Sequence, residues 1–218
     1  LDRPISPEAR RAILEAACAA PTAGNQQLYT ILDITDQAVK DTLADTCDHQ
    51  PFIAQAPLVL LFCADCQKWY DAFAAGGCSP RRPGPGDLWL ALSDANIAAQ
   101  NAVTAAWSLG IGSCYIGDIL EQVETHRTLL RLPEYVVPAA LLVFGYPTQQ
   151  QQEREKPIVH ENAYRRMEPA ELEAMLADNA GARPYGAWLD AFCKRKYNSD
   201  FSREMSRSMA EYLKPFLP

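Results

Sequence analysis

Two features of the sequence predict a protein of the α+β class. Helical and strand-like segments carry about equal weight along the 218 residues, but they do not alternate strictly, which disfavours a doubly wound parallel sheet. The second feature is a helix over 87–109 that is small and apolar almost all round. A helix without a polar face is expected to be buried inside a domain or between subunits. Because no repeat or clear boundary interrupts the chain, we expect a single domain over 1–218.

The first half of the chain is expected to begin with a helix. Ser6 supplies an N-cap hydroxyl, Pro7 suits the first helical position, and Glu8 places a negative charge at the positive end of the helix dipole. Apolar residues then fall on one face until Pro21 ends the helix. After a polar turn we expect a strand over 29–35, a helix over 36–47 and a buried strand over 58–63.

The second half begins with a segment of different character. Residues 67–86 mix aromatic side chains with Gly, Pro and Arg, which predicts a partly helical excursion that ends in an irregular loop. Beyond the helix over 87–109 we expect a strand over 113–116, a helix over 121–130 and a strand over 136–145. A polar arm then leads to a helical tail, whose last part, 182–218, is expected to wrap over a neighbouring subunit.

The charge balance argues against two classes of partner. The chain has 27 acidic and 20 basic residues, a net charge of −7, and its basic residues stand alone or in short runs such as Arg81-Arg82 and Arg165-Arg166. Binding to nucleic acid or to an anionic membrane needs clustered Lys and Arg, so neither is expected. The sequence also contains no secretory signal and no apolar run long enough to span a membrane, which predicts a cytoplasmic protein.

Cysteine and histidine give little sign of a metal or disulfide site. Seven cysteines at irregular spacing predict free thiols. Cys63 and Cys66 form a Cys-x-x-Cys pair, but the second pair that zinc needs is missing, so a chance pair at a strand end is expected. The three histidines are scattered, and surface or capping roles are expected for His49, His126 and His160.

A dinucleotide-binding fingerprint is only half present. Gly110-Ile111-Gly112 has the first two glycines of such a motif, but Tyr115 stands at the third position. The pair also follows a helix instead of joining a strand to a helix, which disfavours a Rossmann site. The sequence contains no Walker loop, Gly-x-Ser-x-Gly elbow or His-Glu-x-x-His motif either.

Four segments do form a recognisable series. They are the turn Ala-Pro-Thr-Ala-Gly-Asn-Gln-Gln at 20–27, the segment Gln-Pro-Phe-Ile-Ala-Gln-Ala-Pro at 50–57, the helix and turn over 94–117, and Leu132-Pro133 with Gly145-Tyr146-Pro147. In this order and spacing they resemble the nitroreductase family of flavoproteins over roughly residues 1–164. The resemblance implies a mostly antiparallel central sheet flanked by helices, with the long helix at a dimer interface.

The resemblance also implies an activity. Members use bound FMN, so this chain is expected to be a homodimeric enzyme that accepts hydride from NAD(P)H at the flavin N5. A small acceptor, such as a nitroaromatic or a quinone, then replaces the nicotinamide in a two-step, ping-pong reaction. The flavin performs the chemistry, and no catalytic side chain is expected. Two alternatives stay open: a specialised dehydrogenase or dehalogenase of the same fold, and a flavin-storage protein without turnover.

Residues for the flavin are implied by the same resemblance. Gln50 is expected to bond the pyrimidine edge, and a backbone N–H near Gly117 is expected to point at N5, where glycine permits close approach. The alternative for Gln50 is a loop amide bonded to backbone, and for 115–118 an ordinary tight turn. The remaining expected contacts are Pro21, Thr22, Ala23, Asn25, Gln27, Tyr115, Ile116 and Asp118. Gln100 and Asn101 are expected to be structural only.

The phosphate site is incomplete in this sequence. The family binds the FMN phosphate with an Arg-rich motif just before the equivalent of residues 1–6, and the printed chain does not contain it. Because the chain starts at Leu1 without Met, we expect the motif upstream, or else a weakened phosphate site. A second basic contact is expected from Arg154 or Lys156, with solvated charges on a polar arm as the alternative.

The acceptor pocket is predicted in the excursion over 67–86, where the resemblance implies a variable lid above the flavin. Trp69, Tyr70 or Phe73 is expected to stack on a planar acceptor or nicotinamide. Arg82 or its neighbour Arg81 is expected to attract an anionic substituent, such as a dinucleotide phosphate. The alternative is that the aromatic side chains pack beneath an ordinary surface excursion.

Overall fold

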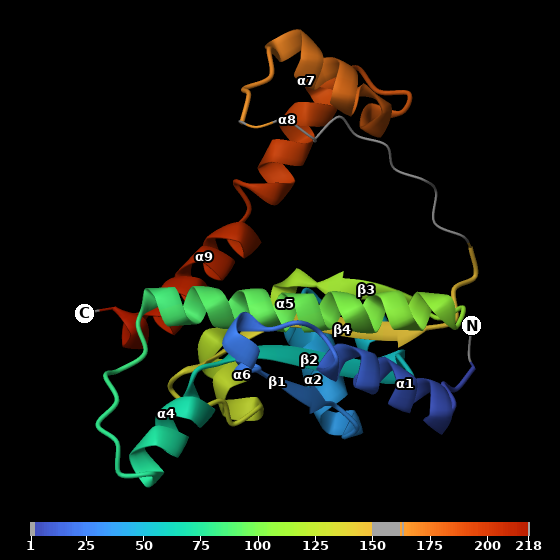
Figure 1. Cartoon of the computed structure of the whole chain (residues 1–218). Coiled ribbons are helices and arrows are strands. Elements are labelled where there is room, and N and C mark those ends of the chain that lie inside the picture. Colours follow the sequence, from blue (N-terminus) through green and yellow to red (C-terminus); the bar gives the residue numbers. More distant parts are fainter. Residues whose placement is uncertain (1–2, 150–161, 163, 218) are drawn as a thin grey trace. The chain divides into compact units, whose positions relative to one another are not determined.

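The computed structural model shown in Figure 1 describes residues 3–149, 162 and 164–217. By residue contacts the chain divides into two compact units, Leu1–Thr148 with Glu204–Pro218, and Gln149–Arg203. The organisation of 1–218 as a single functional domain stays a prediction. Among the described residues, no helix combines the length and the apolar character needed to cross a membrane.

The first unit is built on a four-stranded sheet in the order β1-β2-β4-β3, and every neighbouring pair is antiparallel. The two inner strands are buried along almost their whole length, which explains their continuous apolar sequence. The α+β class and the antiparallel sheet are confirmed. The strands are β1 (Tyr29–Asp33), β2 (Leu58–Asp65), β3 (Gly112–Ile116) and β4 (Val136–Gly145).

Helices cover both faces of this sheet. One face packs against α1 (Pro7–Cys18) and α5 (Pro85–Ser108), the long helix that lies along the sheet in Figure 1. The opposite face packs against the remaining helical segments of the core. These are α2 (Gln37–Thr46), α3 (Pro51–Gln55), the short 3-10 turn η2 (Gly117–Leu120) and α6 (Val123–Leu129). Each central strand therefore alternates its side chains between two apolar clusters.

The long helix α5 has two different faces. Its buried face is mostly alanine at helical spacing, which lets the helix lie close to the sheet. Its other face is open in the single chain and mixes apolar with polar side chains. Trp89 is 75% exposed and Trp107 is 79% exposed, with Leu90 and Ile97 also exposed. The exposed polar residues include Ser93, Asn96, Gln100 and Thr104. Within the single chain, the helix that was predicted to be buried is therefore buried on one side only.

Three local differences from the sequence prediction have simple causes. The helix α5 begins two residues early, at Pro85, because the Asp87 carboxylate accepts the N–H of Gly84 at 2.8 Å and caps the start. The short α3 forms because Pro51 suits a first helical position. The helix α6 begins at Val123, since Gln122 has a left-handed backbone with φ of 46°.

The excursion over 67–86 starts as α4 (Gln67–Ala75), and the polar turn before β1 contains the 3-10 turn η1 (Ala23–Asn25). The second unit contains α7 (Pro169–Leu176), the 3-10 turn η3 (Ala177–Ala180) and α8 (Tyr185–Lys196). The helix α9 (Asp200–Leu213) starts in the second unit and continues into the first.

The end of the described chain packs on its own core. Tyr212 of α9 and Phe216 of the 3-10 turn η4 (Lys214–Phe216) are fully or nearly fully buried in a third apolar cluster with Leu28, Ala64 and Val137. The predicted extension over 182–218 is helical, but its last part, from Glu204, belongs to this chain's own first unit. Coverage of a partner subunit by the residues before Glu204 stays a prediction.

Candidate functional site

Gln50 lies where the chain turns from α2 into α3. Its side-chain Nε2 donates to the Cys47 carbonyl oxygen at 2.7 Å and to the Asp118 carboxylate at 3.0 Å. Both amide protons are therefore in use, and the amide oxygen is the atom that can accept from an incoming donor. The backbone N–H of Gln50 donates to the Ala44 carbonyl oxygen at 2.7 Å, so the whole residue is held by its neighbours.

The strand β3 forms one edge of the sheet and leads directly to Asp118. Ile116 is buried in the core and anchors the strand, whereas the Tyr115 ring is exposed and its hydroxyl makes a long hydrogen bond of 3.4 Å to Gln100. A Cβ added at Gly117 would meet no atom within 4 Å. Open space thus lies in front of this backbone, beside the Gln50–Asp118 pair.

A second group of predicted residues lies in the turn between α1 and β1, and Asp94 of α5 holds it. The two carboxylate oxygens of Asp94 accept the backbone N–H of Ala23 at 2.9 Å and that of Leu28 at 3.2 Å. Asp94 is only 2% exposed. A buried carboxylate is costly unless its oxygens are hydrogen-bonded, and here the backbone of the turn provides the donors.

The turn itself has an unusual backbone. Gly24, Asn25 and Gln27 all have positive φ, at 56°, 55° and 51°. Left-handed conformations are costly for residues other than glycine, so contacts from outside must maintain the shape. One internal contact is the Thr22 hydroxyl, which accepts the Gln27 N–H at 3.2 Å. Pro21 precedes the turn and is exposed.

The two groups are separated by the sheet. The turn leads into β1 at one edge, and Gly117 follows β3 at the other, which puts them about 14 Å apart across the sheet at the usual spacing of strands. The register adds an offset along the strands, because Tyr29 is level with Val137 of β4 and Ile116 with Leu141. Asp94 also belongs to α5 on one face, whereas Gln50 and Asp118 lie with α3 and η2 on the opposite face. One chain therefore does not bring both groups onto the same small ligand.

A cavity of about 330 Å³ opens beside the turn. The Trp69 indole N–H donates to the Gln26 carbonyl oxygen at 2.8 Å, and this bond fixes α4 against the turn. Gln26, Trp69, Tyr70 and Phe73 all line the cavity. Its other lining residues are Leu28, Cys66, Cys78, Ser79, Pro80, Arg81, Pro83, Asp87 and Leu90.

The predicted acceptor residues differ in their surroundings. The Trp69 and Phe73 rings lie 5.5 Å apart, and Tyr70 packs against Tyr135 at the same centroid distance. The structure thus brings the three predicted aromatic residues together at one cavity, with Tyr70 anchored in the core beneath it. Arg82 is exposed and is not among the lining residues.

Arg81 lines the cavity but is already paired. Its guanidinium makes two hydrogen bonds to the Asp87 carboxylate, at 2.6 and 3.0 Å, and this contact lowers the pKa of Asp87. The other predicted cationic contacts, Arg154 and Lys156, lie outside the residues that the structure describes.

All seven cysteines are free, as expected. Burial raises the pKa of the Cys63 and Cys66 thiols to about 12 each. Both thiols therefore stay protonated near neutral pH, where they are poor nucleophiles and poor metal ligands. Within the described residues, no group of three or more His, Cys, Asp or Glu side chains is arranged to hold a metal ion.

The expectation of a surface or capping role was wrong for His126. Its ring is fully buried, with Nδ1 at 3.1 Å from the Ile119 carbonyl oxygen and Nε2 at 2.8 Å from the Thr46 hydroxyl. Burial lowers its pKa. His49 is exposed beside Asp45, and His160 lies outside the described residues. Sequence spacing gave no sign of the buried position, because His126 lies on a short helix of mixed composition.

Two acidic residues of interest were also missed. Asp94 is a charged residue on an otherwise apolar helix, and that contrast is the signal that could have identified it. Glu121 is nearly buried, and burial with neighbouring carboxylates raises its pKa to about 7. No sequence pattern marks Glu121, because its surroundings come from three separate segments.

The fold and the site define a class: an α+β protein with an antiparallel sheet whose edge strand leads into an open, hydrogen-bonded turn. The chain belongs to the nitroreductase family, whose model matches residues 1–146. Recognition of the family from the four segments is confirmed.

Individual relatives support this assignment. An oxygen-insensitive NADPH nitroreductase of Salmonella typhimurium is 33% identical over 168 residues, which are 75% of this chain and 68% of that protein. An FMN reductase [NAD(P)H] of Bacillus subtilis is 30% identical over 213 residues, 97% of this chain and 84% of that protein. Nitroreductase A of Vibrio parahaemolyticus has the same fold, with a TM-score of 0.84 at 24% identity, covering 100% of this chain and 91% of its own.

Proposed function

We propose that this protein is an FMN-dependent oxidoreductase that takes electrons from NAD(P)H and passes them to a small acceptor such as a nitroaromatic or a quinone. The class predicted from the sequence, an NAD(P)H-dependent flavin oxidoreductase, is also the class that its relatives' names give. Bound FMN would supply the hydride chemistry in two successive half-reactions, and the chain would supply binding, orientation and electrostatics.

The observation that carries this proposal is the Gln50–Asp118 pair beside the open backbone at Gly117. The Gln50 amide oxygen suits an N–H donor such as the flavin pyrimidine edge, since both amide protons are already bonded. The space before Gly117 allows a planar ring to approach the backbone. Tyr115 and Ile116 belong to the same strand end, and Arg154 or Lys156 would bind the phosphate.

The site needs a second copy of the chain. Because the turn over 21–27 lies across the sheet from Gln50, we propose that Pro21, Thr22, Ala23, Asn25 and Gln27 of one protomer complete the flavin site of its partner. The large apolar side chains exposed on α5 support this assembly, since Trp89 and Trp107 would otherwise stay in water. If each protomer completes the site of the other, the assembly is a homodimer with both flavins at the subunit boundary.

The cavity beside the turn suits the acceptor or the nicotinamide. Its volume of about 330 Å³ lies at the small end of the range for small-molecule sites. Trp69 and Phe73 offer aromatic surface to a planar molecule, and Tyr70 supports them from the core side. Arg82 lies outside the lining, so its proposed role is to attract an anionic substituent at the entrance.

The test is the colour and redox behaviour of the purified protein. We expect flavin absorbance, release of FMN on denaturation, bleaching by NAD(P)H without oxygen, and recovery of colour when a nitroaromatic or a quinone is added. Protein saturated with FMN that stays colourless after desalting would refute the proposal. Bound flavin that NAD(P)H does not bleach would favour the storage role instead.

A further inference from the structure

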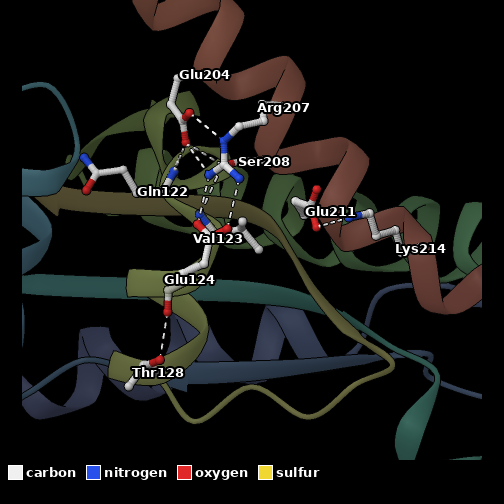
Figure 2. Close-up of polar contacts among 9 residues, drawn as sticks. All are labelled: Gln122, Val123, Glu124, Thr128, Glu204, Arg207, Ser208, Glu211 and Lys214. Carbon is white, nitrogen blue, oxygen red and sulfur yellow. Dashed lines mark hydrogen bonds and ion pairs between the residues drawn. The ribbon is translucent and has the colours of Figure 1, made fainter.

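The helix α9 docks on the start of α6 through polar contacts (Figure 2). The Gln122 N–H donates to the Glu204 carboxylate at 3.2 Å, and the Val123 N–H donates to the Ser208 hydroxyl at 3.1 Å. The first N–H groups of a helix have no acceptor within that helix. Side chains of α9 therefore act as the missing cap of α6.

Arg207 ties the two helices together at the same place. Its guanidinium makes two bonds of 2.9 Å to the Glu124 carboxylate on α6 and bonds Glu204 within α9 at 2.8 Å. These bonds lower the pKa of Glu204 to about 2, with Arg207 as the main cause. Glu204 is therefore a carboxylate across the whole physiological range.

Glu121 lies in the chain between η2, which contains Asp118, and the start of α6, where α9 docks. Its own N–H donates to the Asp118 carbonyl oxygen at 3.0 Å, and the next N–H, that of Gln122, donates to Glu204. Glu121 is 7% exposed, and its Oε1 is buried without a hydrogen-bond partner in the described part of the chain. A carboxylate in such a position lacks the donors that an ionised oxygen requires.

The charges around Glu121 come from three separate segments of the chain. Asp118 lies in η2, Asp48 lies between α2 and α3, and Glu204 lies in α9. Burial is the main cause that raises the pKa of Glu121 to about 7, and all three carboxylates add to it because they disfavour the ionised form. The cation of this cluster, Arg207, is already bonded to two other carboxylates.

Two further titratable groups in this region do not ionise near neutral pH. The Cys47 thiol has its pKa raised to about 12 by burial and by Asp118 and Glu121, so it stays neutral. The buried His126 ring has its pKa lowered and is neutral as well. Glu121 is thus the member of the described cluster whose charge changes between pH 6 and 8.

We propose that Glu121 is a positioning residue whose protonation couples the docking of α9 to the Gln50–Asp118 pair, and through that pair to flavin binding. The inference rests on the proposed function for its last step only. The neutral carboxyl lets Asp118 and Glu204 lie close to it. The ionised carboxylate repels both. Repulsion of Glu204 weakens its bond to the Gln122 N–H at the start of α6, and repulsion of Asp118 weakens its bond to Gln50.

The main test uses the full chain loaded with FMN and three proteins: wild type, Glu121→Gln and Glu134→Gln. Gln keeps the size of Glu and mimics its neutral form, and Glu134 is an exposed acid outside the cluster. We expect the FMN dissociation constant of wild type and Glu134→Gln to rise about threefold to tenfold more between pH 6 and 8 than that of Glu121→Gln. Ionisation of the FMN phosphate is common to all three proteins and cancels in the comparison.

Two measurements on wild type need neither flavin nor a variant. In carbon-detected NMR of glutamate-labelled protein, one carboxyl should titrate near pH 7. Over the same range the amides of 204–217 should lose protection, measured as their exchange rate relative to the intrinsic base-catalysed rate at each pH. Identical pH profiles for wild type and Glu121→Gln would overturn the proposal. If Glu121→Gln does not fold, the absence of a glutamate titrating above pH 6 in wild type would overturn it instead. Protein that never binds FMN would refute the proposed function, whereas the titration and the exchange would still test the coupling to α9.

Discussion

Asp94 shows how one buried side chain can define a site that it does not enter. Its carboxylate holds both ends of a turn whose residues have unfavourable backbone angles. The exposed turn therefore owes its shape to a buried carboxylate. Substitution of a residue that touches no ligand should for this reason alter ligand binding.

We expect Asp94→Ala to lower both stability and FMN affinity. Two backbone N–H groups would lose their acceptor, at about 1–3 kcal/mol each where they are buried. The control is Asn101→Ala on the same helix, because Asn101 bonds the Ala16 carbonyl oxygen of α1 and does not contact the turn. Denaturant unfolding and FMN titration should show a stability loss in both variants and a tenfold or larger affinity loss, about 1.4 kcal/mol, in Asp94→Ala alone. Equal FMN affinities in the two variants would contradict this role.

Gln50 tests the other half of the site. Gln50→Glu removes both donated protons and places a second carboxylate beside Asp118, so FMN affinity should fall at least tenfold while the fold survives. Gln37→Glu is the matched control, because Gln37 is exposed and also donates to a backbone carbonyl oxygen. Fluorescence titration with FMN measures the effect, and unchanged affinity in Gln50→Glu would remove Gln50 from the site.

At the scale of the element, the Trp69–Gln26 hydrogen bond joins α4 to the turn. The helix itself buries none of its residues completely, so its position depends on a few contacts. Such helices are the parts of a structure that shift most easily. The shape of the cavity therefore depends on the indole N–H.

Trp69→Phe keeps an aromatic ring and removes that N–H. We expect the KM for planar acceptors to rise by about threefold to tenfold, in line with the loss of one hydrogen bond, at unchanged FMN content. Trp188→Phe in α8 is the control, since it makes the same chemical change outside the cavity. Steady-state kinetics with a quinone and a nitroaromatic would check this, and wild-type KM values in Trp69→Phe would exclude the cavity as the acceptor site.

Long, strongly patterned elements were predictable, and short ones were not. The apolar runs of β2 and β4 and the Ser6 cap of α1 have signals within one segment. The segments α3 and η2 are about one turn long, and their shape depends on contacts with residues far away in the sequence, such as the Gln50–Asp118 bond. The polar turn before β1 was predictable from its sequence, but Asp94 and Glu121 depend on tertiary burial that no local pattern encodes. The binding roles of the predicted site residues stay predictions.

At the scale of the whole molecule, the exposed face of α5 should determine the assembly. We expect Ile97→Glu to weaken the dimer, because a charge on an apolar interface must be desolvated without a partner. FMN should be lost together with the dimer, since each site needs two chains. Sedimentation at micromolar concentration, with Glu15→Gln as an exposed control on α1, measures both species. A monomeric variant that retains FMN would disprove shared sites.

Stability should have an optimum in mildly acidic solution. Glu204, with its pKa lowered to about 2 from an ordinary 4.5, contributes stability above pH 4.5 that is lost as the pH falls toward 2. Glu121, with its pKa raised to about 7, contributes stability that is full below pH 4.5 and declines as the pH rises through 7. Because Glu204 is partly exposed, its effect should be small. Thermal unfolding from pH 3 to 9 should show Tm falling between pH 5 and 8 in wild type and not in Glu121→Gln.

Tyr212 and Phe216 are buried against residues from the first half of the chain, so this part of the core can be completed only at the end of synthesis. During synthesis, Leu28 and Ala64 leave the ribosome long before these two aromatic partners exist. The nascent chain must therefore carry an unfilled apolar surface until about 150 further residues have been made. Chaperone demand should thus be greatest late in translation, and shortening the chain before Tyr212 should yield insoluble protein even though the four described strands are present.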